Sequence, residues 1–135
     1  MNLTKGQREA VRLKFGGRCA YCGEPLTKRF HVDHVEPVLR NISKNYAMER
    51  PENNTLENLY PACIPCNLYK SSCPVELFRE RIAMQVDVTR RASRSYRTAE
   101  AFGLVKPTGN PVVFWFENIT LGRCPHDNRY PYQIT

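Results

Sequence analysis

The sequence predicts a single small α+β domain that is held together by a zinc ion. Its 135 residues suit one domain with a modest core, which we place at residues 1–135. Two Cys-x2-Cys pairs, Cys19–Cys22 and Cys63–Cys66, are separated by a long gap. Helical and strand-like patterns flank both pairs, and no internal repeat or low-complexity segment interrupts them.

An N-terminal helix is predicted over residues 4–15. Thr4 and Gln7 match the capping-box pattern, in which a threonine at the cap is followed three positions later by a glutamine. Ala10, Val11 and Phe15 can share one face of this helix. Gly16-Gly17 follows and is expected to end it.

The segment "FHVDHVEP", residues 30–37, alternates well enough to form a strand. Val32 and His34 would then lie on one side and His31 and Asp33 on the other. Residues 38–54 lack a clear period and are expected to form a loop, with one helical turn at most. A short helix should begin near Cys66.

A long helix with a stripe from Phe78 to Ala99 is predicted after Pro74, and Gly103 should close it. The run "NPVVFWFENI", residues 110–119, is rich in β-branched and aromatic residues and predicts a strand. We expect Trp115 and Phe116 to belong to the core. The organisation is therefore a core at residues 17–72, an extension at 73–120 and a loose tail at 121–135.

The charge of the chain favours a polyanionic partner. Lysines and arginines number 20 against 13 acidic residues, which gives a net charge of +7. Nucleic acid is the first candidate and an anionic membrane surface the second. The N-terminus has no apolar signal-peptide core, and no apolar run is long enough to span a membrane, so we expect a cytoplasmic protein without a membrane partner.

The two cysteine pairs predict a structural zinc site. Cys19, Cys22, Cys63 and Cys66 form a four-thiolate set, and structural zinc takes four tetrahedral ligands with no open position. A thioredoxin-like redox pair is the alternative, but no βαβ pattern surrounds either pair. Cys73 and Cys124 have no partner at ligand spacing and are interpreted as ordinary thiols.

Asp33 and His34 form a second candidate site. A carboxylate offers a hard oxygen suited to Mg²⁺ or Mn²⁺, and an imidazole exchanges a proton near neutral pH, as a general base must. The motif alone is also compatible with a surface strand or a further zinc site. Asn58 and Asn67, which lie beside the second cysteine pair, favour the catalytic interpretation.

Taken together, "CAYCG", "HVDHVEP" and "NTLENLYPACIPCNLYKS" resemble the HNH endonuclease family over about residues 17 to 72. The resemblance implies a ββα-metal, treble-clef-like core. It also implies that Asp33 and Asn67 bind one divalent ion, that His34 activates water, and that Asn58 holds the His34 loop without touching the metal. His31 would contact metal, water or phosphate. Asn67 stands where many members have histidine, which leaves the preferred metal open.

Candidate DNA contacts lie in "TRRASRSYR", residues 89–97, which contains no acidic residue. Arg90, Arg94 and Arg97 would share a helical face, with Arg91 beside it, and arginine-rich faces suit phosphates. A solvated helix surface is the alternative. Further basic residues lie near the catalytic segments in the sequence: Arg18, Lys28, Arg29 and Lys70.

The sequence therefore favours a zinc-containing HNH nuclease that hydrolyses phosphodiester bonds in DNA, most simply duplex DNA, with Mg²⁺ or Mn²⁺. A zinc-containing DNA-binding module without catalysis is the main alternative, and a protein-binding zinc domain is a second, although the latter leaves the positive charge unexplained. By family resemblance, small free-standing proteins of this kind often come from bacteriophages. Double-strand cleavage by a monomer with one site would need a dimer or two visits.

Overall fold

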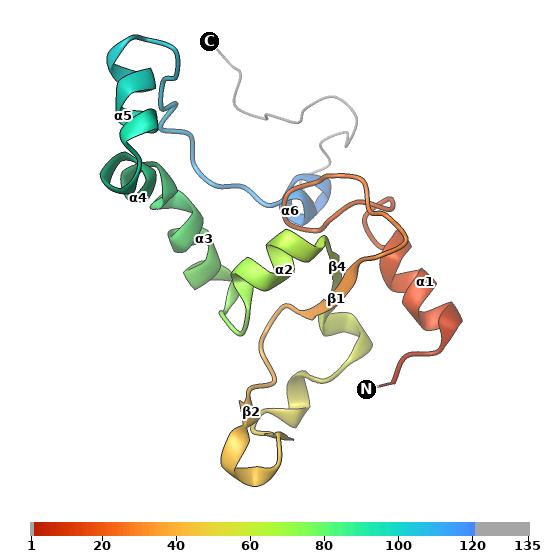
Figure 1. Cartoon of the computed structure of the whole chain (residues 1–135). Coiled ribbons are helices and arrows are strands. Elements are labelled where there is room, and N and C mark those ends of the chain that lie inside the picture. Colours follow the sequence, from red (N-terminus) through yellow and green to blue (C-terminus); the bar gives the residue numbers. More distant parts are fainter. Residues whose placement is uncertain (1, 121–135) are drawn as a thin grey trace. The chain divides into compact units, whose positions relative to one another are not determined.

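The structure, a computed structural model, describes residues 2–120 (Figure 1). The chain divides into two compact units: the first runs to Val75 and resumes at Phe114, and the second is Glu76–Val113. The predicted tail at 121–135 and Cys124 lie outside the described residues. None of the described helices is both long and apolar enough to cross a membrane.

The N-terminal helix α1 covers Lys5–Leu13, a little shorter than predicted. Its capping box is present: the Gln7 amide donates to Thr4 Oγ1 at 3.1 Å, and the Thr4 amide donates to Gln7 Oε1 at 2.9 Å. Val11 is its buried residue. The Lys14 ammonium then donates to the carbonyl groups of Leu56 and Leu59 at 3.0 and 2.7 Å, which ties the end of α1 to β4 (Leu59–Ala62).

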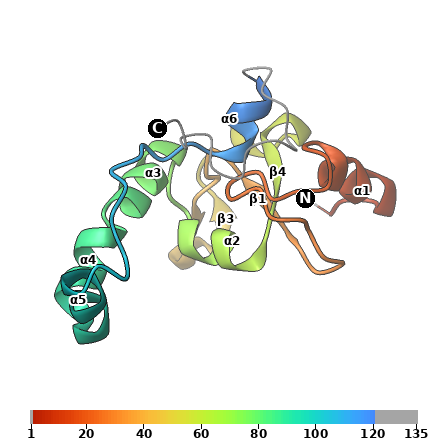
Figure 2. The ribbon, with the colours of Figure 1, turned by 90° about the horizontal axis from the view of Figure 1, so that it is seen from above.

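A ββα unit forms the centre of the first unit. Strand β1 (His31–His34) pairs antiparallel with β4, with His31 opposite Ala62 and His34 opposite Leu59. Helix α2 (Ile64–Lys70) follows β4 almost directly and contacts β1, whereas α1 contacts β4 (Figures 1 and 2). The α+β class and the ββα core predicted from the sequence are thus confirmed.

The segment between β1 and β4 contains more structure than the predicted loop. Residues 40–48 form a small antiparallel hairpin with Arg40 opposite Met48. One short 3-10 helix lies between its two strands, and two more follow the hairpin. These elements are β2 (Arg40–Asn41), η1 (Ile42–Lys44), β3 (Ala47–Met48), η2 (Pro51–Asn53) and η3 (Leu56–Asn58). The two strands are too short for a two-residue period to be visible in the sequence.

The single long helix predicted after Pro74 is wrong. The second unit instead has three short helices, α3 (Val75–Ala83), α4 (Gln85–Ala92) and α5 (Arg94–Ala101). Ser93 is extended, and its side chain accepts a hydrogen bond from the Tyr96 amide at 3.1 Å. A serine that caps a new helix competes with continuation of the old one, so the chain breaks there although the apolar spacing continues.

The strand predicted over residues 110–119 is also wrong, because Trp115–Thr120 form helix α6. The Phe114 amide donates to the Glu117 side chain at 3.0 Å, which caps the start of this helix. The amides of Trp115 and Phe116 donate to the carbonyl groups of Tyr21 and Ala20 at 3.0 and 2.9 Å. The run is aromatic because it fills the core, as expected for Trp115, and strand propensity largely reports such packing.

An aromatic cluster joins α6 to the ββα unit. Phe15 and Tyr60 meet edge to face with centroids 4.8 Å apart, and Tyr60 meets Phe116 at 5.1 Å. Tyr21 meets Phe114 at 5.3 Å, also edge to face. Such pairs contribute about 0.5–1.5 kcal/mol each beyond their buried area. Residues from both ends of the described chain therefore share one core.

Gly23 marks the closest approach in this core. Its φ is +77°, and a Cβ built on it would lie 2.7 Å from Trp115 Cε3. Both the backbone conformation and the indole ring therefore require a residue without a side chain at this position.

We expect Gly23→Ala to lower the free energy of unfolding by about 1–3 kcal/mol, since the added methyl must displace a buried indole. Gly6→Ala is the matched control, because Gly6 lies in α1 and a Cβ there meets nothing within 4 Å. That change should be neutral or stabilise by up to about 1 kcal/mol. Denaturant unfolding measures both; equal stability of the two variants would contradict the packing described.

Candidate active site and metal centre

The four predicted zinc ligands converge at one point. The Sγ atoms of Cys19, Cys22, Cys63 and Cys66 all lie within 4.8 Å of one another, and those of Cys22 and Cys63 are 3.8 Å apart. A tetrahedral zinc ion with bonds of about 2.3 Å places its sulfur ligands about 3.8 Å apart. The cysteines are thus positioned to form a metal site, and their spacing fits zinc.

Two local structures position these sulfur atoms. The first pair lies in a turn in which the Cys19 amide donates to Glu24 O at 2.9 Å and the Gly23 amide donates to Cys19 O at 3.0 Å. The second pair spans the start of α2, where Cys63 is the N-cap. The Ala20 amide donates to Pro61 O at 2.8 Å, which joins the turn to β4.

The electrostatics of the cluster favour a cation. Thiol hydrogen bonds from Cys22 and Cys66 lower the pKa of Cys19 to about 2. The same contact with Cys19 raises the pKa of Cys22 to about 12 and raises that of Cys66 as well. One thiolate therefore opposes ionisation of its neighbours, and a bound divalent ion would allow all four to be thiolates.

Asp33, the third residue of β1, is buried and has two side-chain partners. Its Oδ2 accepts a hydrogen bond from the Tyr21 hydroxyl and forms an ion pair with Lys70 Nζ at 3.0 Å. Burial raises the pKa of Asp33, whereas the nearby ammonium and the hydroxyl act in the opposite direction. No hydrogen bond among the described residues uses Oδ1, so this oxygen is free to accept a ligand.

Lys70 is fully buried, so its interpretation as a DNA contact is wrong. Besides Asp33, its ammonium bonds the backbone carbonyl of His34 at 3.0 Å. A buried lysine is stable only when it is paired and hydrogen-bonded, and both conditions are met here. Lys70 therefore links the last turn of α2 to the last two residues of the HVDH strand.

His34 is oriented by an asparagine that the sequence did not single out. Its Nε2 lies 2.9 Å from Asn54 Oδ1, across a stretch of twenty residues. Because the amide oxygen can only accept, Nε2 carries the proton and Nδ1 keeps its lone pair. Asn54 looks like one of several polar loop residues in the sequence, and no spacing rule marks it.

Asn58 joins the chain that follows His34 to the loop that carries Asn54. Its amide nitrogen donates to Glu36 O at 2.8 Å and to Asn53 O at 2.7 Å, and its Oδ1 accepts from the Glu36 amide at 2.9 Å. The first contact holds the chain after β1, and the second holds the residue before Asn54. This geometry is the one that the expected loop-holding role of Asn58 requires.

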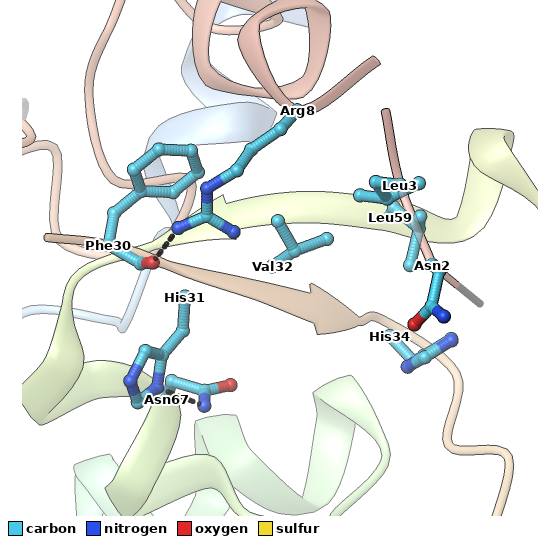
Figure 3. A pocket seen from close by; sticks show the side chains of 9 residues that line it. All are labelled: Asn2, Leu3, Arg8, Phe30, His31, Val32, His34, Leu59 and Asn67. Atoms are coloured by element: carbon cyan, nitrogen blue, oxygen red, sulfur yellow. Dashed lines mark hydrogen bonds between the residues drawn. The ribbon is translucent and has the colours of Figure 1, made fainter. Parts of the chain in front are cut away.

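His31 and Asn67 meet directly, with His31 Nδ1 2.7 Å from Asn67 Nδ2 (Figure 3). The amide nitrogen donates in this arrangement, which leaves Asn67 Oδ1 available to a cation. Asn67 comes one residue after Cys66, so α2 positions a zinc ligand and this amide together.

The predicted catalytic residues line two cavities next to β1. His31, His34 and Asn67 line one of about 610 Å³ (Figure 3). Asp33, His34 and Asn67 line another of about 310 Å³. The structure thus brings four of the five predicted catalytic side chains to shared cavities, and Asn58 lies behind them in the loop.

The four candidate DNA-binding arginines lie in the second unit. Arg90 bonds both oxygens of Glu100 at 2.8 and 2.9 Å and also pairs with Asp87. Arg97 Nη1 donates to the carbonyl groups of Arg90 and Arg91. These two therefore join α4 to α5, whereas Arg91 and Arg94 are exposed.

Comparison with known proteins agrees with this site. Residues 19–72 match the model of the HNH endonuclease family. This segment is thus similar to an HNH domain, and it contains the four cysteines and all five predicted catalytic residues. No curated protein and no solved structure matches the chain.

We expect purified protein to contain a single zinc ion per chain, held against a competing chelator. Cys22→Ser should lose it and unfold at lower temperature, because zinc binding contributes folding free energy. Cys73→Ala is the control, since Cys73 is buried outside the cluster and should keep the ion. Elemental analysis decides; zinc retained equally by both variants would contradict the four-cysteine site.

Nitrogen-15 NMR of the imidazoles tests the role of Asn54. At a pH where His34 is neutral, the wild type should show the Nε2–H tautomer, because Asn54 Oδ1 accepts that proton. Asn54→Ala should yield a mixture of tautomers, whereas Asn54→Asp keeps an acceptor and should keep one form. A mixture already present in the wild type would rule out this hydrogen bond.

Proposed function

We propose that the protein is a metal-dependent endonuclease that hydrolyses phosphodiester bonds in DNA, with His34 as the general base. One observation carries the proposal: His34 is fixed by Asn54 beside Asn67 and Asp33 in one cavity, inside the segment that matches the HNH endonuclease family. A zinc-containing module that only binds DNA would need the cysteines but not this arrangement.

His34 would take a proton from the attacking water. The hydrogen bond to Asn54 leaves Nδ1 as the basic atom, and the Lys70–His34 carbonyl contact holds the backbone from which it projects. Asn58 holds the chain at Glu36 and the loop at Asn53 in place through its side-chain hydrogen bonds. A well-placed general base typically contributes about 10²–10⁴-fold to the rate.

Asp33 Oδ1 and Asn67 Oδ1 are the oxygen atoms that would hold a catalytic Mg²⁺ or Mn²⁺. Both side chains line the same cavity, and both oxygens lack a hydrogen bond among the described residues. A hard cation there would act as a Lewis acid on the phosphate and stabilise the charge of the leaving oxygen. Because Lys70 shares the charge of Asp33, binding of that ion should be weak.

Zinc at the cysteine cluster would have a separate role. Four thiolates close its coordination shell, so water and phosphate have no position on it. It would hold the Cys19–Cys22 turn against the start of α2, and thereby fix Asn67 relative to β1. Duplex DNA is the simplest substrate that fits the net charge of +7.

Plasmid cleavage tests the proposal directly. Wild-type protein should convert supercoiled DNA to nicked or linear forms only with Mg²⁺ or Mn²⁺, and the ratio of the two products distinguishes nicking from double-strand cleavage. His34→Ala should be slower by about 10²–10⁴-fold while its zinc content and circular dichroism are unchanged. Equal cleavage by the two proteins would refute the assignment of His34.

A further inference from the structure

A groove beside the candidate active site is lined by four cationic side chains and one acidic one. It has a volume of about 540 Å³ and lies between α1 and residues 26–30. Its cationic lining residues are Lys5, Arg8, Arg12 and Lys28, and we call it the α1 groove. Arg8 and Phe30 also line the larger active-site cavity, so the two spaces adjoin.

Arg8 connects the groove to the catalytic residues. Its Nη2 donates to Phe30 O, one residue before His31, and its guanidinium carbon lies 4.2 Å from the centre of the Phe30 ring (Figure 3). These contacts leave Nε and Nη1 without a hydrogen-bond partner among the described residues. A guanidinium fixed on one side in this way can still donate to a phosphate oxygen.

The balance of charge along this path points to an anion. The cavity of about 610 Å³ has Arg8, His31 and His34 among its lining residues and no acidic one. Asp33 lines the neighbouring cavity of about 310 Å³, where its carboxylate is paired with Lys70. The groove has one acidic residue, Glu9, and this carboxylate is paired with Arg12 at 2.7 Å. Lys5, Arg8 and Lys28 therefore remain without an acidic partner among the described residues.

Two of the four candidate arginines of the second unit already have partners there. Arg90 is paired with Glu100 and Asp87, and Arg97 donates to backbone carbonyl groups, so these two hold α4 and α5 together. Arg91 and Arg94 are exposed, but they belong to a different unit from His31 and His34. The α1 groove instead has Lys5, Arg8 and Lys28 without an acidic partner among the described residues, and Arg8 lines the same cavity as His31 and His34.

We propose that the α1 groove binds the sugar–phosphate backbone of the DNA next to the cleaved bond, with Arg8 holding the phosphate that enters the active-site cavity. The inference rests on the proposed function and extends it, because it assigns the substrate path. Lys5 and Lys28 would contact flanking phosphates. Such contacts carry no sequence information, so they would position any duplex.

Binding of a labelled DNA duplex, measured by fluorescence anisotropy in a His34→Ala background, tests the groove. Lys5→Glu/Lys28→Glu should weaken binding by at least about tenfold at about 0.1 M salt and reduce the salt slope by about two, since each phosphate contact contributes about one. Lys44→Glu/Lys106→Glu makes the same change of charge at exposed lysines outside the groove and should bind within about threefold of the parent.

Plasmid cleavage by the same pairs with His34 intact separates the two proposals. The groove pair should cleave at least about tenfold more slowly at low DNA concentration, with zinc content and circular dichroism unchanged. Arg8→Gln should slow cleavage as well, and Arg8→Lys should restore part of the rate. If the parent cleaves DNA and the groove pair cleaves as fast as the Lys44/Lys106 pair, the proposed role of the groove is refuted while the proposed nuclease function stands. If the parent neither binds nor cleaves DNA, both proposals fail.

Discussion

The convergence of four sulfur atoms on one point is the constraint on which the rest of the site depends. It joins a turn near the N-terminus to the start of α2, two segments far apart in the sequence. Closing such a long loop costs conformational entropy, and binding of a zinc ion would contribute free energy that offsets it. Since Asn67 follows Cys66 on the same helix, an ion bound at the cysteines would also fix one wall of the candidate active site.

A second, buried interaction links α2 to β1, the strand that carries the proposed catalytic residues. Lys70, at the end of α2, bonds both the Asp33 carboxylate and the His34 carbonyl. A buried ion pair of this kind adds little net stability, yet removing one partner typically costs about 3–5 kcal/mol because the other charge is left unpaired. We interpret this pair as a source of conformational specificity, because it holds α2 against β1 in the register in which His34 lies beside Asn54.

The features that could be predicted from the sequence are those that depend on residues close together in the chain. The capping box of α1, the cysteine ligands and the HVDH strand all follow from spacings of a few residues, and the structure has them. The sequence did not predict α6, because the aromatic run that packs Trp115 against Gly23 looks like a strand. Asn54 and Tyr21 escaped notice because their partners, His34 and Asp33, lie at distances along the chain that no local pattern encodes. The contact of Arg8 with Phe30 could likewise not be predicted, because the two residues are 22 positions apart in the sequence.

The central claim is a division between a closed structural ion and an open catalytic one. Crystals soaked in Mn²⁺ and measured on both sides of the zinc and manganese absorption edges would test it most directly. The account predicts a zinc signal among Cys19, Cys22, Cys63 and Cys66, and a separate manganese signal within bonding distance of Asp33 and Asn67. A manganese signal elsewhere, or zinc bound by His31 or His34 in place of a cysteine, would contradict it.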